Sequence, residues 1–170
     1  MPGRPARLFV AVWPPADVVE QLAALPRLER PGVRWVPRAN WHVTLRFIGD
    51  AVPEAVRSRL DGVRLPGATA QLGPQVDHLG ADAVVVPVEG LGELAGAVVA
   101  ATPDVGRSPD GRPFRGHVTM ARLRRARSEL VGHPLTGSFD VTEVVLARST
   151  LTSAGARYDH IASWPVFAVP

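Results

Sequence analysis

The sequence predicts an α+β fold with a mainly antiparallel sheet. Segments with the alternating apolar pattern of strands follow one another about as often as they follow segments with helical periodicity. No expected strand is followed by the Gly-x-Gly-x-x-Gly of a dinucleotide-binding turn, which argues against a doubly wound parallel sheet. The chain has 170 residues, 46% of them hydrophobic, so it can bury one or two small cores and is too apolar to be disordered.

Three helices and a short fourth one are expected. The first covers 16–25, with Asp17 in its first turn and apolar residues at helical spacing. The second covers 53–60 and opens with a proline, which suits the first turn of a helix. The third covers 91–101, and the short one lies near 128–132.

The strands are expected where β-branched and other apolar residues recur between turn-forming residues. They cover residues 7–13, 33–36, 41–48, 69–79, 83–88, 116–123, 138–151 and 157–169. The segment 102–113 is rich in Gly, Pro and Ser and is expected to form a loop, long enough to act as a mobile flap. No linker divides the chain, so a single domain over 1–170 is expected.

Composition excludes several kinds of chemistry. There is no cysteine, which excludes disulfides, zinc ribbons, iron–sulfur clusters and thiol nucleophiles. All 19 basic residues are arginine, so there is neither a P-loop lysine nor a Schiff-base lysine for pyridoxal phosphate. Any catalysis must therefore use histidine, acids, hydroxyls or arginine, and no cofactor is expected. Guanidinium groups bind phosphate oxygens in pairs, so an arginine-lined phosphate site is chemically available.

No membrane segment or secretory signal is expected. Apolar stretches such as 97–101 are far shorter than the roughly 20 residues that cross a bilayer, and the basic N-terminus lacks a small-residue cleavage pattern. We therefore expect a cytoplasmic protein, a monomer by default, with no obligate protein partner.

A short repeat is the main functional signal. Residues 42–45 read His-Val-Thr-Leu and residues 117–120 read His-Val-Thr-Met, 75 positions apart, each within an expected strand. Side chains two apart on a strand share a face, so each histidine lies beside its threonine while the valine points into a core. The repeat predicts two similar lobes that meet at the His/Thr faces.

Two imidazoles across a groove suit phosphodiester cleavage. Histidine, with a pKa near 6.5, serves at neutral pH as either acid or base. One ring can take a proton from the attacking water while the other protonates the departing alkoxide. The hydroxyls of Thr44 and Thr119 can donate hydrogen bonds to the non-bridging phosphate oxygens. No metal is needed for this scheme.

Two other interpretations compete with this one. A lone histidine in a strand is more often a hydrogen-bonded surface residue, and His78, His133 and His160, which have no matching motif, keep that interpretation. A metal site is the other, but neither motif contains His-x-His, His-Glu-x-x-His or an acid at matching spacing.

The paired motifs resemble those of the two-histidine phosphoesterase superfamily, in particular its RNA 2′,3′-cyclic phosphodiesterase branch, also known as 2′-5′ RNA ligase-like. The similarity covers the strand at 7–11, Trp41 to Gly49 (WHVTLRFIG), Phe114 to Arg122 (FRGHVTMAR) and the pattern of Leu, Ser, Gly, Tyr and Trp over 144–164. Gly116 stands where the family often has proline. The resemblance implies two pseudo-symmetric lobes with one H-x-T-x motif in each and a positively charged groove between them.

The resemblance also implies roles. His42 would be the proton donor to the leaving 3′ oxygen and His117 the proton acceptor that activates water, giving a 2′-phosphate; the residues themselves leave this direction open. Arg122 matches an arginine of the family, yet strand alternation places it opposite His117 unless the strand bulges. Arg46 has the parity of His42 and Thr44, so both arginines are candidate phosphate ligands. Phe9 and Tyr158 are candidate base or ribose contacts.

The expected activity is metal-independent hydrolysis of 2′,3′-cyclic phosphates on RNA ends or nucleotides. Two alternatives remain open: an RNA-end binding module without turnover, and an enzyme for 2′-5′ ligation, for 2′-5′ oligonucleotides or for another cyclic nucleotide.

Overall fold

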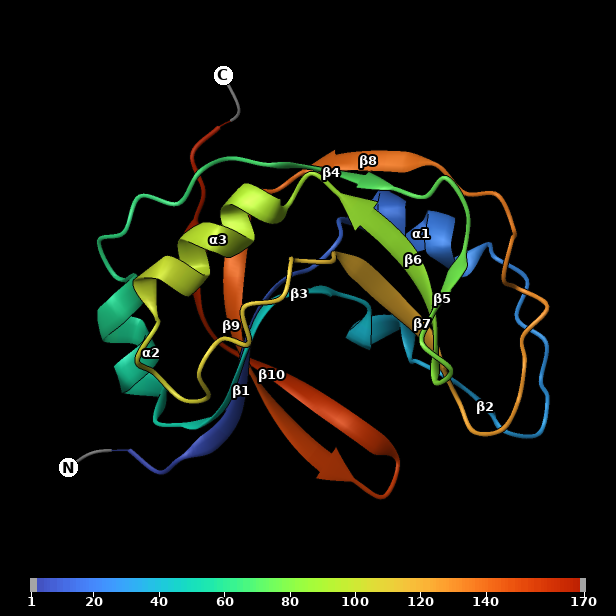
Figure 1. Ribbon diagram of the computed structural model, residues 1–170, viewed down its shortest axis with the longest axis horizontal. Coiled ribbons are helices and arrows are strands. Elements are labelled where there is room, and N and C mark those ends of the chain that lie inside the picture. The colour runs from blue at the N-terminus through green and yellow to red at the C-terminus, as the bar shows by residue number, and fades with distance from the viewer. Residues whose placement is uncertain (1–2, 169–170) are drawn as a thin grey trace.

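The computed structural model describes residues 3–168 (Figure 1). In chain order its elements are β1 (Ala6–Val12), α1 (Ala16–Ala23), β2 (Val33–Trp35), the 3-10 turn Arg38–Asn40, β3 (Val43–Ala51), α2 (Pro53–Leu60), β4 (Thr69–Leu72), β5 (Asp77–Leu79), β6 (Ala83–Glu89), α3 (Gly92–Ala101), β7 (His117–Leu123), β8 (Gly137–Asp140), β9 (Glu143–Thr152) and β10 (Gly155–Pro165). The strands follow the order β10-β9-β1-β3-β7-β6-β4-β8, with β2 paired to β7 and β5 to β6. Neighbouring strands pair antiparallel, which confirms the predicted α+β class.

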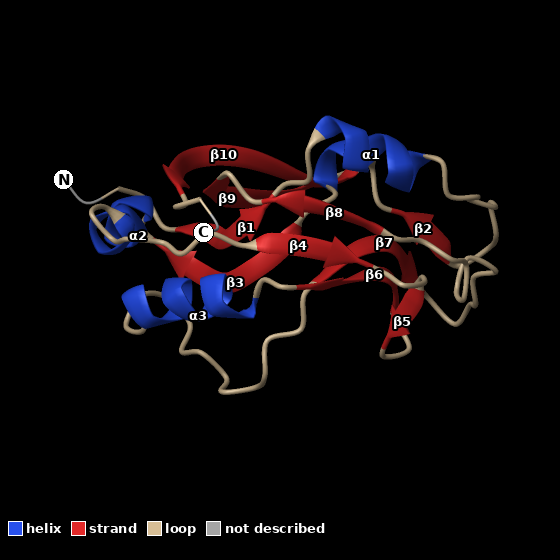
Figure 2. Ribbon diagram, turned by 90° about the horizontal axis from the view of Figure 1, so that it is seen from above, coloured by secondary structure: helices blue, strands red, loops and turns tan. Residues whose placement is uncertain are grey.

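The helices lie toward the two ends of the molecule. Helices α2 and α3 lie together at one end, and α1 lies beside β8 toward the other, as both views show (Figures 1 and 2). Strands β9 and β10 form a hairpin that projects from the sheet (Figure 1). The longest helix in the described part of the chain, α3, has 10 residues, so none there is long enough to cross a membrane.

Four predicted elements need correction. The segment predicted as one strand over 69–79 is divided into β4 and β5, because Gly73 takes a positive φ and Pro74 has no amide hydrogen to donate. The segment 138–151 is divided into β8, which is the last strand at one end of the strand order, and β9, which is the second strand from the other end. The short helix near 128–132 is instead a run of turns around the buried Leu130. The last predicted strand ends at Pro165, and Val169 lies outside the described residues.

The two motif strands are neighbours at the middle of the sheet. Val43 of β3 pairs antiparallel with Val118 of β7. Both valines are buried in the main core, together with Leu45 and Met120, as the alternation predicts. Extending the register by one residue in each direction places His42 opposite Thr119 and Thr44 opposite His117. The pairing therefore creates a local twofold arrangement of the two motifs.

Each motif strand has a β-bulge at the same distance after its histidine. On β3, Thr44 pairs with Ala11 and Arg46 with the next residue, Val10, so Leu45 is the extra residue. On β7, Thr119 pairs with Val85 and Ala121 with Val84, so Met120 is the extra residue. A bulge reverses the alternation of the strand beyond it. The fifth residue after each histidine, Phe47 and Arg122, is thereby returned to the face of the histidines.

The bulge on β3 shows that the prediction for Arg46 as a phosphate ligand is wrong. Arg46 is 5% exposed and points to the core face, away from Thr44. Its guanidinium donates to the carbonyl oxygen and hydroxyl of Thr102, at the C-terminal end of α3, and to the carbonyl oxygens of Val105 (3.0 Å) and Arg107 (2.7 Å). Parity counting failed because it assumed a regular strand.

Arg46 instead fastens the start of the 102–113 loop to the back of β3. The positive guanidinium lies at the negative end of the α3 dipole, and the Arg107 amide donates to the Ile48 carbonyl (2.7 Å) beside it. Burial lowers the pKa of Arg46, and the Asp104 carboxylate partly offsets this, but a guanidinium remains charged at neutral pH. The first half of the loop is thus held to the sheet rather than acting as a flap.

Replacing Arg46 should therefore destabilise the protein. Arg46→Met leaves three loop carbonyl groups without their donors, so we expect the free energy of unfolding in urea to fall by about 3 kcal/mol. The matched control is Arg124→Met, because Arg124 is exposed and should tolerate the same change. A loss below about 0.5 kcal/mol for Arg46→Met, the usual range of surface substitutions, would contradict this role.

Candidate active site

A cavity of about 430 Å³ opens on the face of the sheet opposite the main core. Strands β1, β2, β3, β7, β9 and β10, with the segment before β3, contribute to its walls. Seven of the eight site residues predicted from the sequence line this cavity: Phe9, His42, Thr44, His117, Thr119, Arg122 and Tyr158. The twofold pairing of Val43 with Val118 brings both motifs into this one cavity.

The two histidines lie diagonally across the β3–β7 pair. His42 is opposite Thr119 in the extended register, so His117 is its diagonal neighbour, a relation that puts residues about 7–8 Å apart. His117 and Arg122 are both close enough for their charges to lower the pKa of His42. Such a separation leaves room for one phosphate group between the two imidazoles.

Backbone carbonyls orient both imidazoles in the same way. The Nδ1 atom of His42 lies 2.7 Å from the Asn40 carbonyl oxygen, and Nδ1 of His117 lies 2.8 Å from the Arg115 carbonyl oxygen. A carbonyl oxygen only accepts, so each Nδ1 carries the hydrogen and each neutral ring has its lone pair on Nε2. On His42 this Nε2 accepts a hydrogen bond from the Thr44 hydroxyl (3.0 Å).

Aromatic rings enclose His42 and change its acidity. Trp13 stacks on the imidazole with ring centroids 5.0 Å apart, Phe9 lies at 4.9 Å, and Tyr158 meets it edge-on at 5.1 Å. Burial among these rings lowers the pKa of His42 to about 4. The Asn40 carbonyl opposes this shift, while repulsion from His117 and Arg122 adds to it. In the ligand-free protein His42 is therefore neutral at pH 7.

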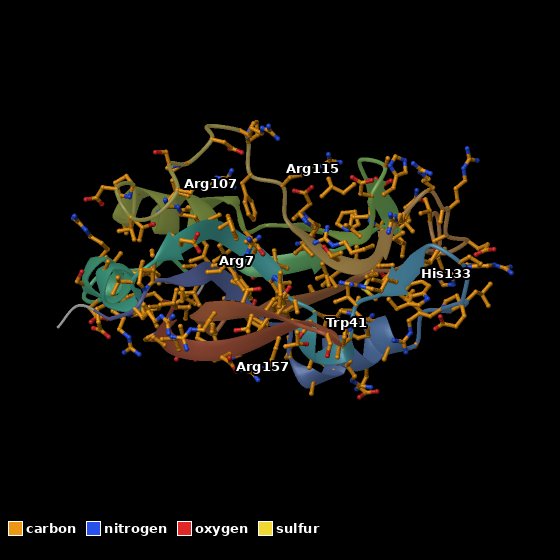
Figure 3. The ribbon with its side chains drawn as sticks, turned by 90° about the horizontal axis from the view of Figure 1, so that it is seen from below. Arg7, Trp41, Arg107, Arg115, His133 and Arg157 are labelled. Carbon is orange, nitrogen blue, oxygen red and sulfur yellow. The ribbon has the colours of Figure 1, made fainter. Side chains whose placement is uncertain are left out.

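The charged groups of the cavity are all cationic. Arg7 and Arg34 line it together with Arg122, and no aspartate or glutamate within residues 3–168 does so. The Arg7 guanidinium lies 4.9 Å from the centre of the Phe47 ring, in a cation–π contact. Seen from below, Arg7 lies between Arg107 and Arg115 on one side and Arg157 on the other (Figure 3). The arrangement favours an anionic ligand.

The other three predicted ligand contacts, Tyr158, Phe9 and Arg46, differ in whether a ligand can reach them. Tyr158 is partly exposed at the cavity wall, so it remains available to a ligand. Phe9 is 4% exposed, and its ring packs against His42, Trp13 and Tyr158, so it supports the site from below and has little free surface for a base. Arg46 does not line the cavity.

Sequence reasoning missed several residues that pack on His42 or line the cavity, among them Trp13, Arg34, Phe47 and Arg7. Trp13 directly follows β1, which pairs with β3, and Arg34 lies in β2, which pairs with β7. These pairings join segments distant in sequence, and nothing in the local sequence marks either residue. Phe47 carried a signal, since it stands at the same offset after His42 as Arg122 after His117. Reading that offset required knowing that both strands bulge.

Comparison with known proteins identifies the family. Residues 12–70 match the family described as LigT-like phosphoesterase. An RNA 2′,3′-cyclic phosphodiesterase of Geobacillus stearothermophilus is 27% identical over 157 residues, which cover 80% of this chain and 48% of that protein, so the chain spans about half of it. One of Aeropyrum pernix is 29% identical over 144 residues, covering 74% of this chain and 82% of that protein.

The fold gives the decisive match. The crystal structure of Escherichia coli LigT in its apo form superimposes with a TM-score of 0.76 at 30% identity, covering 96% of this chain and 99% of that one. The chain belongs to the LigT-like phosphoesterase family. The same protein complexed with 3′-AMP gives a TM-score of 0.77, and it has also been solved with ATP, NADP+ and phosphate. Membership of this family implies a phosphodiesterase-type hydrolase, and nucleotides bind to its E. coli member.

The burial of His42 can be tested by NMR. Titration of its imidazole in the ligand-free protein should give a midpoint near 4. Trp13→Ala should raise this pKa toward 6.5, because water reaches the ring once the stacked indole is removed. His160→Ala is the matched control, since His160 contacts Trp13 and is not among the rings packed on His42. A wild-type midpoint above 6 would exclude this account.

The same shift predicts a pH-dependent stability. The pKa of His42 is about 4 when folded and near 6.5 when unfolded, so the unfolded chain takes up its proton first as the pH falls. His42 thus contributes full stability above pH 6.5 and loses it progressively between 6.5 and 4, by at most about 3 kcal/mol. Urea unfolding at pH 7 and 4.5 should show a smaller acid-induced loss in His42→Gln than in the wild type. Equal losses in the two proteins would disprove the linkage.

Proposed function

We propose that the chain is a metal-independent RNA 2′,3′-cyclic phosphodiesterase that opens the cyclic phosphate to a 2′-phosphate by acid–base catalysis. The observation that carries the proposal is that His42, Thr44, His117 and Thr119 line one cavity, with the two imidazoles diagonal to each other. In-line hydrolysis needs a base on one side of phosphorus and an acid on the other.

His117 acts as the base in this proposal. Its Nδ1–H is held by the Arg115 carbonyl, so its Nε2 lone pair is free to accept a proton from a water molecule. The water oxygen then attacks phosphorus opposite the 3′ oxygen. The new P–O bond forms as the bond between phosphorus and the 3′ oxygen breaks.

His42 acts as the acid and protonates the departing 3′ oxygen. It must first carry a second proton on Nε2, although in the empty cavity its pKa is lowered to about 4. A bound phosphate anion supplies the negative charge that favours the imidazolium, so substrate binding raises this pKa. The Asn40 carbonyl keeps accepting from Nδ1–H in both protonation states.

The remaining groups stabilise charge on the phosphate. In this proposal the hydroxyls of Thr44 and Thr119, which line the cavity, donate to the two non-bridging oxygens, and Arg122 adds a guanidinium that is already charged. Thr44 contacts Nε2 of His42 in the empty site, so its hydroxyl must turn from the imidazole to the phosphate when substrate binds.

The relatives support the choice of substrate class. Proteins at 27% and 29% identity are named RNA 2′,3′-cyclic phosphodiesterases, and E. coli LigT binds 3′-AMP and phosphate. The cationic lining of the cavity in this chain is the feature that a nucleic-acid end requires.

The test is hydrolysis of adenosine 2′,3′-cyclic phosphate and of a cyclic-ended oligoribonucleotide in the presence of EDTA. We expect the 2′-phosphate as product, identified by ³¹P NMR, and a loss of at least about 10²-fold in kcat for His42→Ala and for His117→Ala. His133→Ala, an exposed histidine that does not line the cavity, should retain wild-type activity.

The outcomes separate the proposal from its rivals. Wild-type activity in His42→Ala or in His117→Ala refutes acid–base catalysis by the two histidines. Tight binding of the cyclic-ended RNA with no product identifies an RNA-end binding module, and cleavage confined to 2′-5′ linkages identifies a different phosphodiesterase.

A further inference from the structure

Two arginines stand side by side at one end of the cavity. Arg34 of β2 and Arg122 of β7 are direct partners in the antiparallel register, so their Cα atoms are about 5 Å apart. Both side chains are exposed, and both residues line the cavity. Like charges placed directly opposite each other in a sheet destabilise it. An anion bound between the two guanidinium groups would relieve their repulsion.

No carboxylate in the described residues compensates this charge. Three arginines recur at intervals of four residues along this part of the chain, at positions 30, 34 and 38. Arg30 pairs with Glu129 at 2.9 Å and Arg38 pairs with Glu20, but within residues 3–168 Arg34 has no acidic partner. The same holds for Arg122 there. The arginine that lines the cavity is thus the one of the three left without an acid.

The reacting phosphate does not require Arg34. A cyclic phosphodiester has one negative charge and two non-bridging oxygens. Thr44 and Thr119 offer one hydroxyl each and Arg122 a bidentate guanidinium, which together supply four donors to these oxygens. The five N–H groups of Arg34 are therefore available to a second anionic group, at a distance of about one strand spacing from Arg122.

We propose that Arg34 binds the phosphate on the 5′ side of the terminal nucleotide, so that the site selects phosphorylated RNA ends over a bare nucleoside 2′,3′-cyclic phosphate. The inference rests on the proposed function and names its substrate class more narrowly. Neighbouring phosphates of one nucleotide are linked through a single ribose, and two adjacent guanidiniums can hold one each. Arg34 is then a specificity-determining residue that takes no part in proton transfer.

The experiment compares two substrates that differ by one group: adenosine 2′,3′-cyclic phosphate and the same molecule with a 5′-phosphate. We expect kcat/KM of the wild type to be about 10-fold or more higher for the 5′-phosphorylated substrate. Arg34→Gln should remove this preference, so its loss of kcat/KM should be larger for the 5′-phosphorylated substrate than for the unphosphorylated one. Arg34→Lys should retain part of it, and Arg124→Gln, an exposed arginine outside the cavity, all of it.

Binding measurements keep the inference separate from catalysis. By calorimetry, adenosine 2′,5′-bisphosphate should bind the wild type more tightly than adenosine 2′-phosphate, and Arg34→Gln should abolish the difference. For the bisphosphate, log Kd should depend less on salt concentration in Arg34→Gln than in the wild type, because one charge contact is lost. This result stands even for a protein that turns over neither cyclic substrate, which would refute only the proposed function.

Two results would overturn the proposal. Equal losses for both substrates in Arg34→Gln would show that Arg34 acts on the reacting phosphate or on the fold. A wild type that does not distinguish the two ligands, in rate or in affinity, would show that no second phosphate is bound.

Discussion

The antiparallel pairing of Val43 with Val118 is the contact on which the site depends. Both valines are buried, so the two motif strands are held together by the core on one face of the sheet while their histidines and threonines share the other. A shift of one strand by one residue in this register would turn its histidine and threonine into the core. Core packing and the composition of the cavity are therefore set by the same pair of residues.

The two bulges complete what this pairing begins. Each inserts one residue after the His-Val-Thr motif and so returns the fifth residue after the histidine to the cavity. On β7 that residue is Arg122. Regular alternation predicts it on the face opposite His117, whereas the family resemblance predicts it beside the phosphate, and the bulge explains why it lines the cavity. On β3 the same irregularity sends Arg46 to the other face, where it holds the end of α3 and the loop that follows. The same kind of bulge thus places Arg122 in the cavity and Arg46 in the core, where it stabilises the fold.

Much of the fold and of the site could be predicted from the sequence. The features that could not be predicted depend on contacts between segments distant in sequence or on backbone groups. The fold class, α2, β6 and the His42 and His117 motifs follow from periodicity and repetition, which are local signals. The division of 138–151 into β8 and β9 was missed because a strand that changes partners keeps its apolar pattern. Trp13 and Arg34 were missed because pairings between distant strands bring them to the cavity. Asn40 and Arg115 orient the histidines through their carbonyl groups, which any residue type provides.

The difference between Phe47 and Arg122 gives the cavity a polarity that the repeat alone would lack. Up to the fourth residue after each histidine the strand geometry is matched, so a symmetric anion would meet equivalent surroundings in two orientations. At the fifth, one half presents a guanidinium and the other an aromatic ring capped by Arg7. An asymmetric ligand, with a sugar on one side of its phosphate, then has a single preferred sense of entry. The difference between Phe47 and Arg122 thus turns a nearly twofold-symmetric cavity into one that binds an asymmetric ligand in a single orientation.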